Sequence, residues 1–515
     1  MLCGAFIFVR REGKGETLLY GKTRCAGRRE GKSEFSRVGI MLGLLAWAVL
    51  AGQTRGQYLF DDTTTMLPSS TLHFAEDGAS SAINGINRPP AVCFNNKTYV
   101  TYQGVNNAPM VTVCDHIKKA WGPIVKAGTS PLGDTDTHGA PSMVIDKEGY
   151  LHIFFGSHGG KQVYVKSRKP EDITDWMEMP PIHGSMTYPN AAALESGELV
   201  MIGRTGGGHK APWSEISPKD GGKTWNTPKA ILNYHPNGIY AAATVGPNNK
   251  TFHLSWSLDD LQINARYARM GIARKKKGPW DYVADARRHA FYAMRDENGV
   301  WRNVQGQALQ TPLNLEQSFE KCLVYRGDWP EHGNYPIVEV SPDGRPSMMF
   351  LNGRLPDDPK LWTLDTVSYD QNFARWDGKK WVITKVTETD MMWDSGHAIF
   401  FGPEKNQVDV YLVAGGSRIN GKNTTLGRRG GDIQHWRSMD DGKSWEQQAD
   451  VITFLQTGRL FIHPTRVVNC HPDGKFVFVN FATDKGYRSN DFRHNAYLYG
   501  DSGFCRKDPK KFRSK

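Results

Sequence analysis

Five polar and aromatic side chains stand at matching positions in three successive segments of the sequence. Each segment consists of an apolar strand, a tight turn of Asp, Asn, Glu or Gly residues, and a second apolar strand. His138, Tyr188 and Tyr240 stand just ahead of the first strands, and His158 and Arg204 follow second strands. Two antiparallel strands joined by a tight turn return to the same edge, so we expect these five side chains to gather on one face. One such residue alone would more often be structural, and the argument depends on their convergence.

This combination of side chains suits the cleavage of an acidic sugar by elimination. The C5 proton of a uronic acid becomes removable only when its neighbouring carboxylate is neutralised. Arg204 suits that task because a guanidinium is always protonated and binds a carboxylate through two donors. A base must then take the C5 proton, and an acid must protonate the O4 leaving group. Tyrosine beside positive charge and histidine can both serve, and no metal is required.

The elements that must position these residues repeat along the chain. Strand-like runs and turn dipeptides recur at about 50 residues in the first half and more loosely later, which is typical of propeller blades. We expect an all-β, seven-bladed β-propeller over residues 57–505 with about four antiparallel strands per blade. Residues from about 260 to 330 would be an insertion in the fourth blade, and residues 57–85 would supply a closing strand. The seven turn markers are Asn95-Asn96, Glu148-Gly149, Ser196-Gly197, Asn248-Asn249, Asp343-Gly344, Glu404-Lys405 and Asp473-Gly474.

Two further segments support the propeller. Residues 438–445 match the Asp-box pattern Ser-x-Asp-x-Gly-x-Ser/Thr-Trp throughout, and residues 218–225 match it except that Pro218 replaces the first serine. In such boxes Asp and Gly shape a turn between the two outer strands of a blade, and Trp packs between sheets. They indicate the fold and say nothing directly about the reaction.

Propeller geometry predicts further residues at the same mouth. The first strand of each blade lines the central channel and the second returns beside it, and ligands usually bind at such a mouth. His397 and His463 reach this mouth from later blades. The residues that we expect to bind substrate there are Tyr240, His332, Asn352 and Arg354.

Glycoside hydrolysis is the main alternative chemistry, and it would need two placed carboxylates. The matched positions carry none, and the nearest acidic residues are Asp134, Asp136 and Asp394. A sialidase-like hydrolase and a non-catalytic glycan-binding propeller remain the alternatives to a lyase.

The ends of the chain indicate secretion. Residues 38–51 form an apolar run of signal-peptide length, so we expect residues 1–56 to be a leader with the signal peptide at 38–56. The net charge of +11 falls to about +5 without this leader, which fits an anionic substrate but gives no argument for nucleic acid. Residues 506–515 read as a basic tail. We expect a monomer that has no membrane partner after signal removal.

Five cysteines follow the leader. In an oxidising compartment Cys93 and Cys114 could form a local disulfide, with one cysteine of the five left over. Cys470 and His471 together with His463 suggest a structural zinc site as a weaker alternative, because no second close-spaced cysteine pair is present. The sequence therefore predicts no metal and no cofactor.

Several of these residues also carry a family resemblance. They resemble the propeller polysaccharide lyases of the BNR-repeat class, including ulvan lyases and the related rhamnosyl-glucuronate lyases. The resemblance covers roughly residues 85 to 500, is specific over 135–260, and is weaker after Tyr267. The motifs that carry it are His138-Gly-Ala-Pro, Phe155-Gly-Ser-His158-Gly, Tyr188-Pro, Arg204 with its Gly-rich loop, Tyr240 and Leu254-Ser-Trp256.

The resemblance implies a role for each matching residue. His138, His158, Tyr188 and Arg204 would form the catalytic centre, with Arg204 and His158 on the carboxylate, and Tyr240 would line a sugar subsite. Together these observations predict a secreted lyase that cleaves a uronic-acid-containing, ulvan-like polysaccharide, with or without sulfate groups, by metal-independent β-elimination. The polymer and the endo or exo mode stay open.

Overall fold

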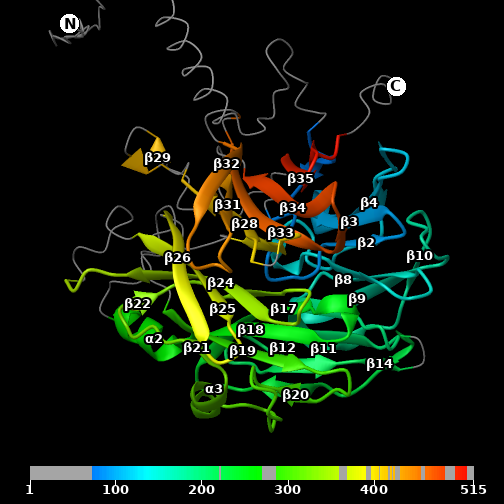
Figure 1. The fold of residues 1–515 in the computed structure, drawn as a ribbon. Coiled ribbons are helices and arrows are strands. Elements are labelled where there is room, and N and C mark those ends of the chain that lie inside the picture. The colour runs from blue at the N-terminus through cyan, green and yellow to red at the C-terminus, as the bar shows by residue number, and fades with distance from the viewer. Residues whose placement is uncertain are drawn as a thin grey trace, which may run out of the picture. The chain divides into compact units, whose positions relative to one another are not determined.

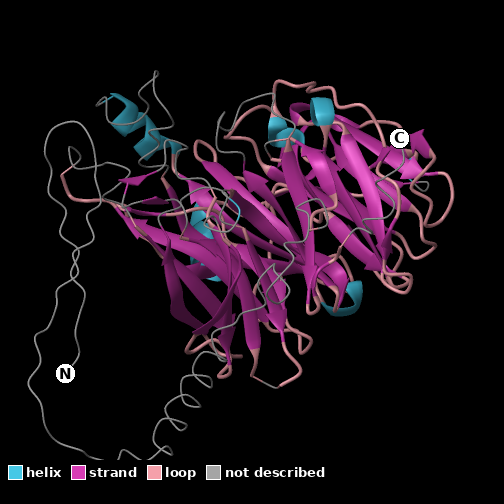
Figure 2. Ribbon diagram, turned by 90° about the horizontal axis from the view of Figure 1, so that it is seen from above, coloured by secondary structure: helices cyan, strands magenta, loops and turns pink. Residues whose placement is uncertain are grey.

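The protein is described by a computed structural model, in which strands predominate (Figure 2). The described residues are 72–79, 81–219, 222–269, 286–358, 368–389, 396–404, 406–415, 418–419, 422–423, 430–453, 457, 459–481 and 493–506. The predicted leader, nearly all of the basic tail and Asp394 lie outside them. Two α-helices occur among the described residues, α2 (Leu261–Arg269) and α3 (Leu315–Lys321). No helix in this described part has the length and hydrophobicity to span a membrane. The all-β prediction is therefore confirmed.

The largest sheet combines the two ends of the described chain. Its order is β1-β35-β34-β33-β2-β3-β4-β5, with β6 paired to β4 and β36 to β35 (Figure 1). Strand β1, within the predicted closing segment, pairs with β35. The bounds are β1 (Ala75–Gly78), β2 (Ala91–Phe94), β3 (Lys97–Gln103), β4 (Pro109–Asp115), β5 (Ala120–Trp121), β6 (Val125–Lys126), β33 (Leu460–His471), β34 (Gly474–Phe481), β35 (His494–Gly500) and β36 (Gly503–Phe504).

The second sheet carries three of the four predicted catalytic residues, His158, Tyr188 and Arg204. Its order is β16-β13-β12-β11-β9-β8-β7, with β10 paired to β9, and a small β14-β15 ribbon follows β13. The bounds are β7 (Ser142–Ile145), β8 (Leu151–Phe155), β9 (His158–Ser167), β10 (Trp176–Glu178), β11 (Ile182–Ala193), β12 (Leu199–Thr205), β13 (Trp213–Ile216), β14 (Pro218–Lys219), β15 (Thr224–Trp225) and β16 (Lys229–Leu232).

Three smaller antiparallel sheets follow along the chain. Their orders are β17-β18-β19-β20 with β21 on β19, β22-β24-β25-β26 with β23 on β24, and β27-β28-β31-β32. A short ribbon of β29 (Arg418–Ile419) and β30 (Lys422–Asn423) stands apart. The bounds are β17 (Gly238–Val245), β18 (Phe252–Asp259), β19 (Arg287–Arg295), β20 (Trp301–Arg302), β21 (Leu323–Tyr325), β22 (Glu331–His332), β23 (Ile337–Val340), β24 (Pro346–Arg354), β25 (Tyr369–Trp376), β26 (Trp381–Thr389), β27 (His397–Phe401), β28 (Val408–Ala414), β31 (Asp432–Ser438) and β32 (Glu446–Ile452).

One prediction about the fourth repeat was wrong. Residues from about 260 to 330 were expected to form an insertion, but β19 lies within that range and is an integral strand beside β18. The α2 helix and residues 270–285, which lie outside the description, separate β18 from β19. Because this segment interrupts the spacing of about 50 residues between repeats, the sequence pattern did not predict β19.

The turns and the core agree with the repeat pattern. Each of the seven predicted turn markers lies between two consecutive strands that pair with each other, although Lys405 itself is not described. Apolar side chains from neighbouring sheets pack together between them. One core cluster joins Ile202 and Trp213 of the second sheet to Trp256 and Phe291 of the β17–β20 sheet. This packing fixes the relative positions of β11, β12 and β17, which carry the candidate site.

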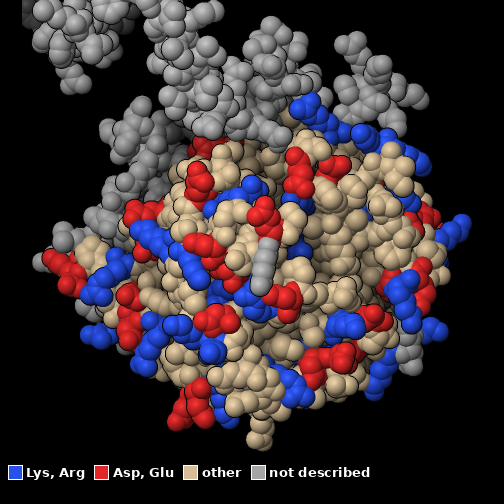
Figure 3. All heavy atoms as spheres, in the orientation of Figure 1, with Lys and Arg blue, Asp and Glu red and all other residues tan. Residues whose placement is uncertain are grey.

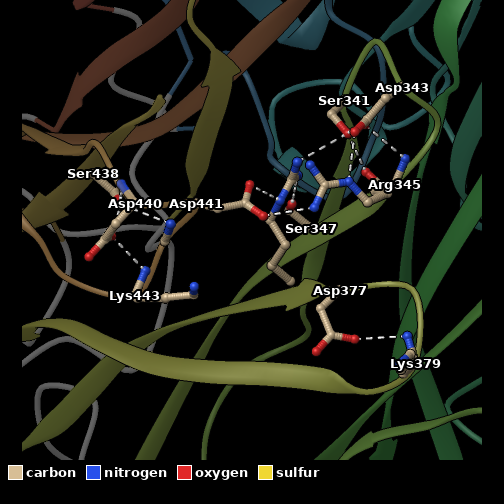
Figure 4. Close-up of polar contacts among 12 residues, drawn as sticks. Ser341, Asp343, Arg345, Ser347, Asp377, Lys379, Ser438, Asp440, Asp441 and Lys443 are labelled. Atoms are coloured by element: carbon tan, nitrogen blue, oxygen red, sulfur yellow. Dashed lines mark hydrogen bonds and ion pairs between the residues drawn. The ribbon is translucent and has the colours of Figure 1, made fainter. Parts of the chain in front are cut away.

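The segment 438–445 forms the turn between the outer strands β31 and β32 (Figure 4). The carboxylate of Asp440 accepts hydrogen bonds from Ser438 Oγ at 2.7 Å and from the backbone N–H of Lys443 at 3.0 Å. Asp441 forms an ion pair of 2.7 Å with Arg345, which also bonds Asp343 in the preceding sheet. The turn is therefore tied to its neighbour by charge as well as by packing.

The predicted local disulfide was also wrong. Cys93 on β2 and Cys114 on β4 both lie opposite Thr98 of the intervening strand β3, so two strand spacings separate them. The sulfur atom of Cys114 instead lies against that of Cys505, which follows β36, and Cys93 is a free cysteine. A contact across 391 residues of sequence leaves no local spacing signal.

Charged side chains of both signs are interspersed over the face drawn in Figure 3. No single-sign area covers this face, as a nucleic-acid-binding surface would require. This mixture agrees with the small positive charge that remains outside the leader.

Candidate active site

Two histidines share one carboxylate at the start of the second sheet. Asp136 precedes the short 3₁₀ turn η3 (Thr137–Gly139) and caps it by accepting the backbone N–H of His138 at 3.0 Å. The same carboxylate bonds Nδ1 of His138 and, at 2.6 Å, Nδ1 of His158 at the start of β9. The two rings stack with centroids 4.0 Å apart and planes inclined by 14°. With both Nδ1 hydrogens directed at Asp136, the proton-accepting lone pair of each neutral ring lies on Nε2.

Asp136 is held in its charged form. Burial acts to raise the pKa of this carboxyl, but the hydrogen bonds from His138 and His158 outweigh it and lower the pKa well below its usual range. The matched positions themselves carry no carboxylate, and Asp136, one of the three nearby acidic residues considered in the sequence, is the carboxylate that contacts them. The sequence signal was present, because an aspartate two residues ahead of His138 can cap a turn and turn back toward the same side chain. A permanently ionised Asp136 suits the orientation of histidines and cannot supply a proton.

Tyr188 lies within β11 rather than ahead of it. The pairing register of β11 with β12 shifts between Thr187 and Asn190, and Tyr188 has a φ of +60° at this bulge. A bulge turns a side chain out of the regular alternation of a strand, which directs the Tyr188 ring along the edge of the sheet. Its centroid lies 6.4 Å from that of His138. The bulge is a tertiary feature that the sequence pattern did not predict.

Arg204 is the most buried member of the group. It lies on β12 opposite Thr187 and is only 2% exposed. Its Cζ lies 5.0 Å from the centroid of Tyr188 and 5.6 Å from that of Tyr240, so the guanidinium is held beside both rings. Nε and Nη1 are buried and have no hydrogen-bond partner among the described residues. A buried guanidinium with unsatisfied donors is costly on its own, and it is complementary to a planar anion.

Tyr240 links this group to a second cation. Arg287 of β19 places its Cζ 3.5 Å from the Tyr240 centroid, and its Nη1 donates to Asn334 Oδ1 at 2.7 Å. On another side, the Tyr240 hydroxyl lies 3.4 Å from Nδ1 of His209, which also bonds Asp259 at 3.0 Å. Tyr240 itself lies inside β17, not ahead of it. Sequence reasoning missed Arg287 because it follows the interrupted fourth repeat, where no motif marks it.

The structure therefore brings together five predicted side chains in one row. The row runs from η3 and β9 across β11 and β12 to β17, and its members come from successive repeats, as the sequence pattern required. Their chemical roles stay predictions. The members are His158, His138, Tyr188, Arg204 and Tyr240.

The other predicted substrate-binding residues form a separate group on β22 and β24. His332 is buried, and its Nε2 lies 2.8 Å from the Tyr369 hydroxyl. Asn352 donates to the Tyr325 hydroxyl at 2.8 Å, and exposed Arg354 pairs with Asp357 at 3.2 Å.

The later histidines occupy the interior. His397 is 2% exposed and bonds Gln371 at 2.5 Å, and burial lowers its pKa to about 3, so it is neutral. His463 is 1% exposed and has a φ of +56° within β33. The expectation that His397 lies open at a mouth was wrong, because a side chain at the first position of an inner strand packs against the adjacent sheet.

A distinct cavity lies at the far end of the same strands. It is lined by turn residues such as Gly246 and Asn248 and by the ion cluster of Arg88, Glu339 and Arg466. Glu339 lies 2.8 Å from Arg88 and 3.0 Å from Arg466. Arg88 is thus committed to an internal ion cluster.

Two clusters of described residues have metal-ligating side chains close enough to hold one ion. The first is Asp136, His138 and His158, and the second is Cys114, His116 and Cys505. In the first cluster the hydrogen bonds already account for the arrangement of all three side chains.

The chain belongs to a family defined by repeats of this kind. Residues 97–389, more than half of the sequence, match the model of the BNR repeat-containing family. The family resemblance seen in the sequence is confirmed by this match.

Relatives with assigned activities indicate the class of enzyme to which the chain is similar. The chain is 27% identical over 467 residues to an ulvan lyase of Nonlabens ulvanivorans, and the alignment covers 85% of this chain and 91% of that protein. It is 25% identical over 472 residues to an ulvan lyase of Alteromonas sp. (strain LOR), covering 84% and 87%. A PL25 ulvan lyase of Pseudoalteromonas sp. (strain PLSV) is 23% identical over 499 residues, covering 90% and 92%. These relatives confirm the prediction of a polysaccharide lyase.

Solved structures agree on the fold. The chain superposes on a PL25 ulvan lyase bound to -[GlcA(1-4)Rha3S]- with a TM-score of 0.68 at 20% identity, covering 85% of this chain and 98% of that one. The polysaccharide lyase Uly1 superposes with a TM-score of 0.52 at 13% identity, covering 84% and 93%. At these identities the likeness establishes a shared propeller-like β architecture.

Proposed function

We propose that this protein is a secreted lyase that cleaves an ulvan-like, uronic-acid-containing polysaccharide by metal-independent β-elimination. The observation that carries the proposal is the buried guanidinium of Arg204, whose Nε and Nη1 lack partners in the described structure. It lies beside Tyr188 and Tyr240 in a row that ends at the Asp136-bound histidines. The ulvan lyase relatives support the same substrate class.

Arg204 would bind the uronate carboxylate. A carboxylate can accept two parallel N–H bonds from the Nη1–Nη2 edge of the guanidinium, and binding there would satisfy the Nη1 donor that folding leaves unpaired. Neutralising this carboxylate acidifies the neighbouring C5 proton and stabilises the negative charge that develops when the proton leaves. His158, one ring from His138, would complete the carboxylate contacts.

His138 and Tyr188 would divide the proton transfers. Asp136 fixes the His138 ring with its lone pair on Nε2, which suits it to accept the C5 proton. A tyrosine hydroxyl carries its proton at neutral pH and can donate it to O4 as the C4–O4 bond breaks. The electron pair of the C5–H bond then forms the C4–C5 double bond. The products are an unsaturated uronate and a new chain end with a free hydroxyl, and protons balance between the two residues.

The finer architecture is part of the proposal. We propose seven blades, because each of the two large sheets divides into two four-stranded meanders of antiparallel neighbours and the other three sheets supply one meander each. The two halves of the first sheet meet through a single parallel pair, Val92 with Val468. The blades would span residues 57–505 after removal of the leader 1–56. A monomer is part of the same proposal.

The direct test is to incubate the purified full chain with ulvan and to follow the ultraviolet absorbance of unsaturated uronate. A rise in absorbance that brief chelation leaves unchanged supports metal-independent elimination. New reducing ends without absorbance would replace the proposal with a hydrolase. Binding of ulvan with neither signal would replace it with a glycan-binding propeller. The Arg204→Ala variant, assayed in parallel, tests whether this site is responsible.

A further inference from the structure

A cluster of sulfur and nitrogen ligands lies away from the candidate active site. Cys114 ends the pairing of β4 with β5, His116 follows β4 directly, and Cys505 follows β36 near the carboxyl end of the described chain. One ligand atom from each lies within 4.8 Å of the others. In a tetrahedral zinc site, ligand atoms about 2.0–2.3 Å from the ion are about 3.3–3.8 Å apart, so one ion here would require the two sulfur atoms, which the structure joins, to move apart.

We propose that Cys114, His116 and Cys505 bind a structural Zn²⁺ ion that fastens the carboxyl end of the chain to the first sheet. The structure joins the two sulfur atoms, but the Cα atoms of Cys114 and Cys505 lie 7.6 Å apart. Disulfides usually hold Cα atoms within about 4.4–6.8 Å, so this separation better suits two thiolates that share a metal. Zn²⁺ is the ion that two thiolates and an imidazole favour in a tetrahedral structural site.

The surroundings of His116 prepare it as a ligand. Its Nε2 lies 2.7 Å from Thr98 Oγ1, a contact that fixes the ring orientation and leaves Nδ1 as the nitrogen available to a metal.

His471 is the further donor that the structure offers. It is the last residue of β33, and its ring stacks on that of His116 with centroids 4.1 Å apart. Its Nδ1 accepts the backbone N–H of Asp473 at 3.1 Å, so Nε2 is the nitrogen that could reach a metal. The sequence had suggested zinc on Cys470, His471 and His463. In the structure His463 instead lies beside Gly85 and Gly396 in the interior.

The position of the cluster indicates its purpose. The Trp121 indole N–H, on β5, donates to the Cys505 carbonyl at 3.0 Å, so the same residue is already held to the first sheet by a backbone contact. Zinc binding to the two thiols would release two protons and form two Zn–S bonds, with no oxidant or reductant needed. The ion would link β4 to the segment after β36 and stabilise the sheet that joins both ends of the described chain.

The test begins with the purified full chain, which is reduced, equilibrated with ZnCl₂ and desalted. Mass spectrometry then measures the bound zinc. Alkylation under denaturing conditions with a chelator shows which cysteines are free thiols. We expect one tightly bound zinc per chain, and Cys114 and Cys505 alkylated as free thiols. Protein purified without reductant should show the same result. A disulfide-linked peptide pair in that protein, without zinc, would overturn the proposal.

Variants separate the ligands from the fold. His116→Ala should reduce bound zinc from one ion per chain to near zero. The chelator phenanthroline should lower the melting temperature of the unaltered protein but not that of His116→Ala. Cys322→Ser is the matched control, because Cys322 is buried in another core cluster and should leave the zinc content unchanged. An unchanged zinc content in His116→Ala would also refute the site. The initial rate on ulvan need not change in either variant, so this test is independent of the proposed activity.

Discussion

Replacement of Arg204 by alanine is the sharpest test of the proposed chemistry. A uronate carboxylate on the Nη1–Nη2 edge of Arg204 would accept two charge-assisted hydrogen bonds, each worth about 1.5–3 kcal/mol, one of them from the Nη1 group that has no partner among the described residues. Losing both removes about 3–6 kcal/mol of transition-state stabilisation. At about 1.36 kcal/mol for each tenfold change, kcat/KM on ulvan should fall by about 10²–10⁴.

The same change should leave the fold intact. Arg204 makes no ion pair with any described carboxylate, so its removal exposes no buried partner charge. The loss of its contacts with Tyr188 and Tyr240 costs about 0.5–2 kcal/mol, partly offset because a buried charge is no longer desolvated. The free energy of unfolding, measured with urea, should therefore change by no more than about 2 kcal/mol.

The matched control is Arg168→Ala, which removes an exposed arginine paired with Asp175 on the outer side of the second sheet. It should change neither rate nor stability appreciably, because exposed ion pairs contribute about 0–1 kcal/mol. The assay is the initial rate of unsaturated product formation at several ulvan concentrations. Near-normal kcat/KM in Arg204→Ala, with the control also normal, would refute the assignment of the carboxylate site.

Three further predictions address the neighbouring residues and the fold. Asp136→Asn should lower kcat by about 10²–10⁴, because both histidines lose the carboxylate that orients them. The folded state lowers the pKa of Asp136, so this carboxylate stabilises the fold above the unfolded pKa of about 4, and the stabilisation is lost as the pH falls below that value. The free energies of unfolding of Asp136→Asn and of the unaltered protein should therefore converge in acid. Tyr188→Phe should remove a proton donor and lower kcat by about 10²–10⁴ with KM little changed. Steady-state kinetics measure both constants, and an unchanged kcat would contradict the role of Tyr188 as the proton donor. Asp440→Ala should destabilise the protein by about 1–3 kcal/mol in urea unfolding without altering kcat, since Asp440 accepts four hydrogen bonds within the β31–β32 turn, and a changed kcat would count against a purely structural role.

The pH dependence of Asp440 offers an internal check on the last of these. Hydrogen bonds from Ser444 and Ser438 outweigh the effect of burial and lower the pKa of Asp440 to about 2. Its contribution to stability should therefore be complete above about pH 4 and disappear as pH falls toward 2. The difference between Asp440→Ala and the unaltered protein should shrink over that interval.

Repeat spacing by itself determined the class of fold and the set of side chains to consider. Turn dipeptides and alternating apolar runs are local signals, because a tight turn needs particular residues and a strand needs a period of two. They located all seven turns and the strands that follow them. They also placed His138, His158, Tyr188, Arg204 and Tyr240 at one edge, because antiparallel pairing returns the chain to the same side whatever the remaining fold does.

The tertiary structure alone decided how these residues meet and what surrounds them. The bulge at Tyr188, the shared carboxylate of Asp136 and the contact of Arg287 with Tyr240 depend on packing between sheets that are distant in sequence. The contact of Cys505 with Cys114 likewise became evident only in the structure, because 391 residues separate the two in the sequence. Local sequence fixes the period and direction of a strand, whereas the partners of a side chain across neighbouring sheets depend on register and packing that no local pattern records.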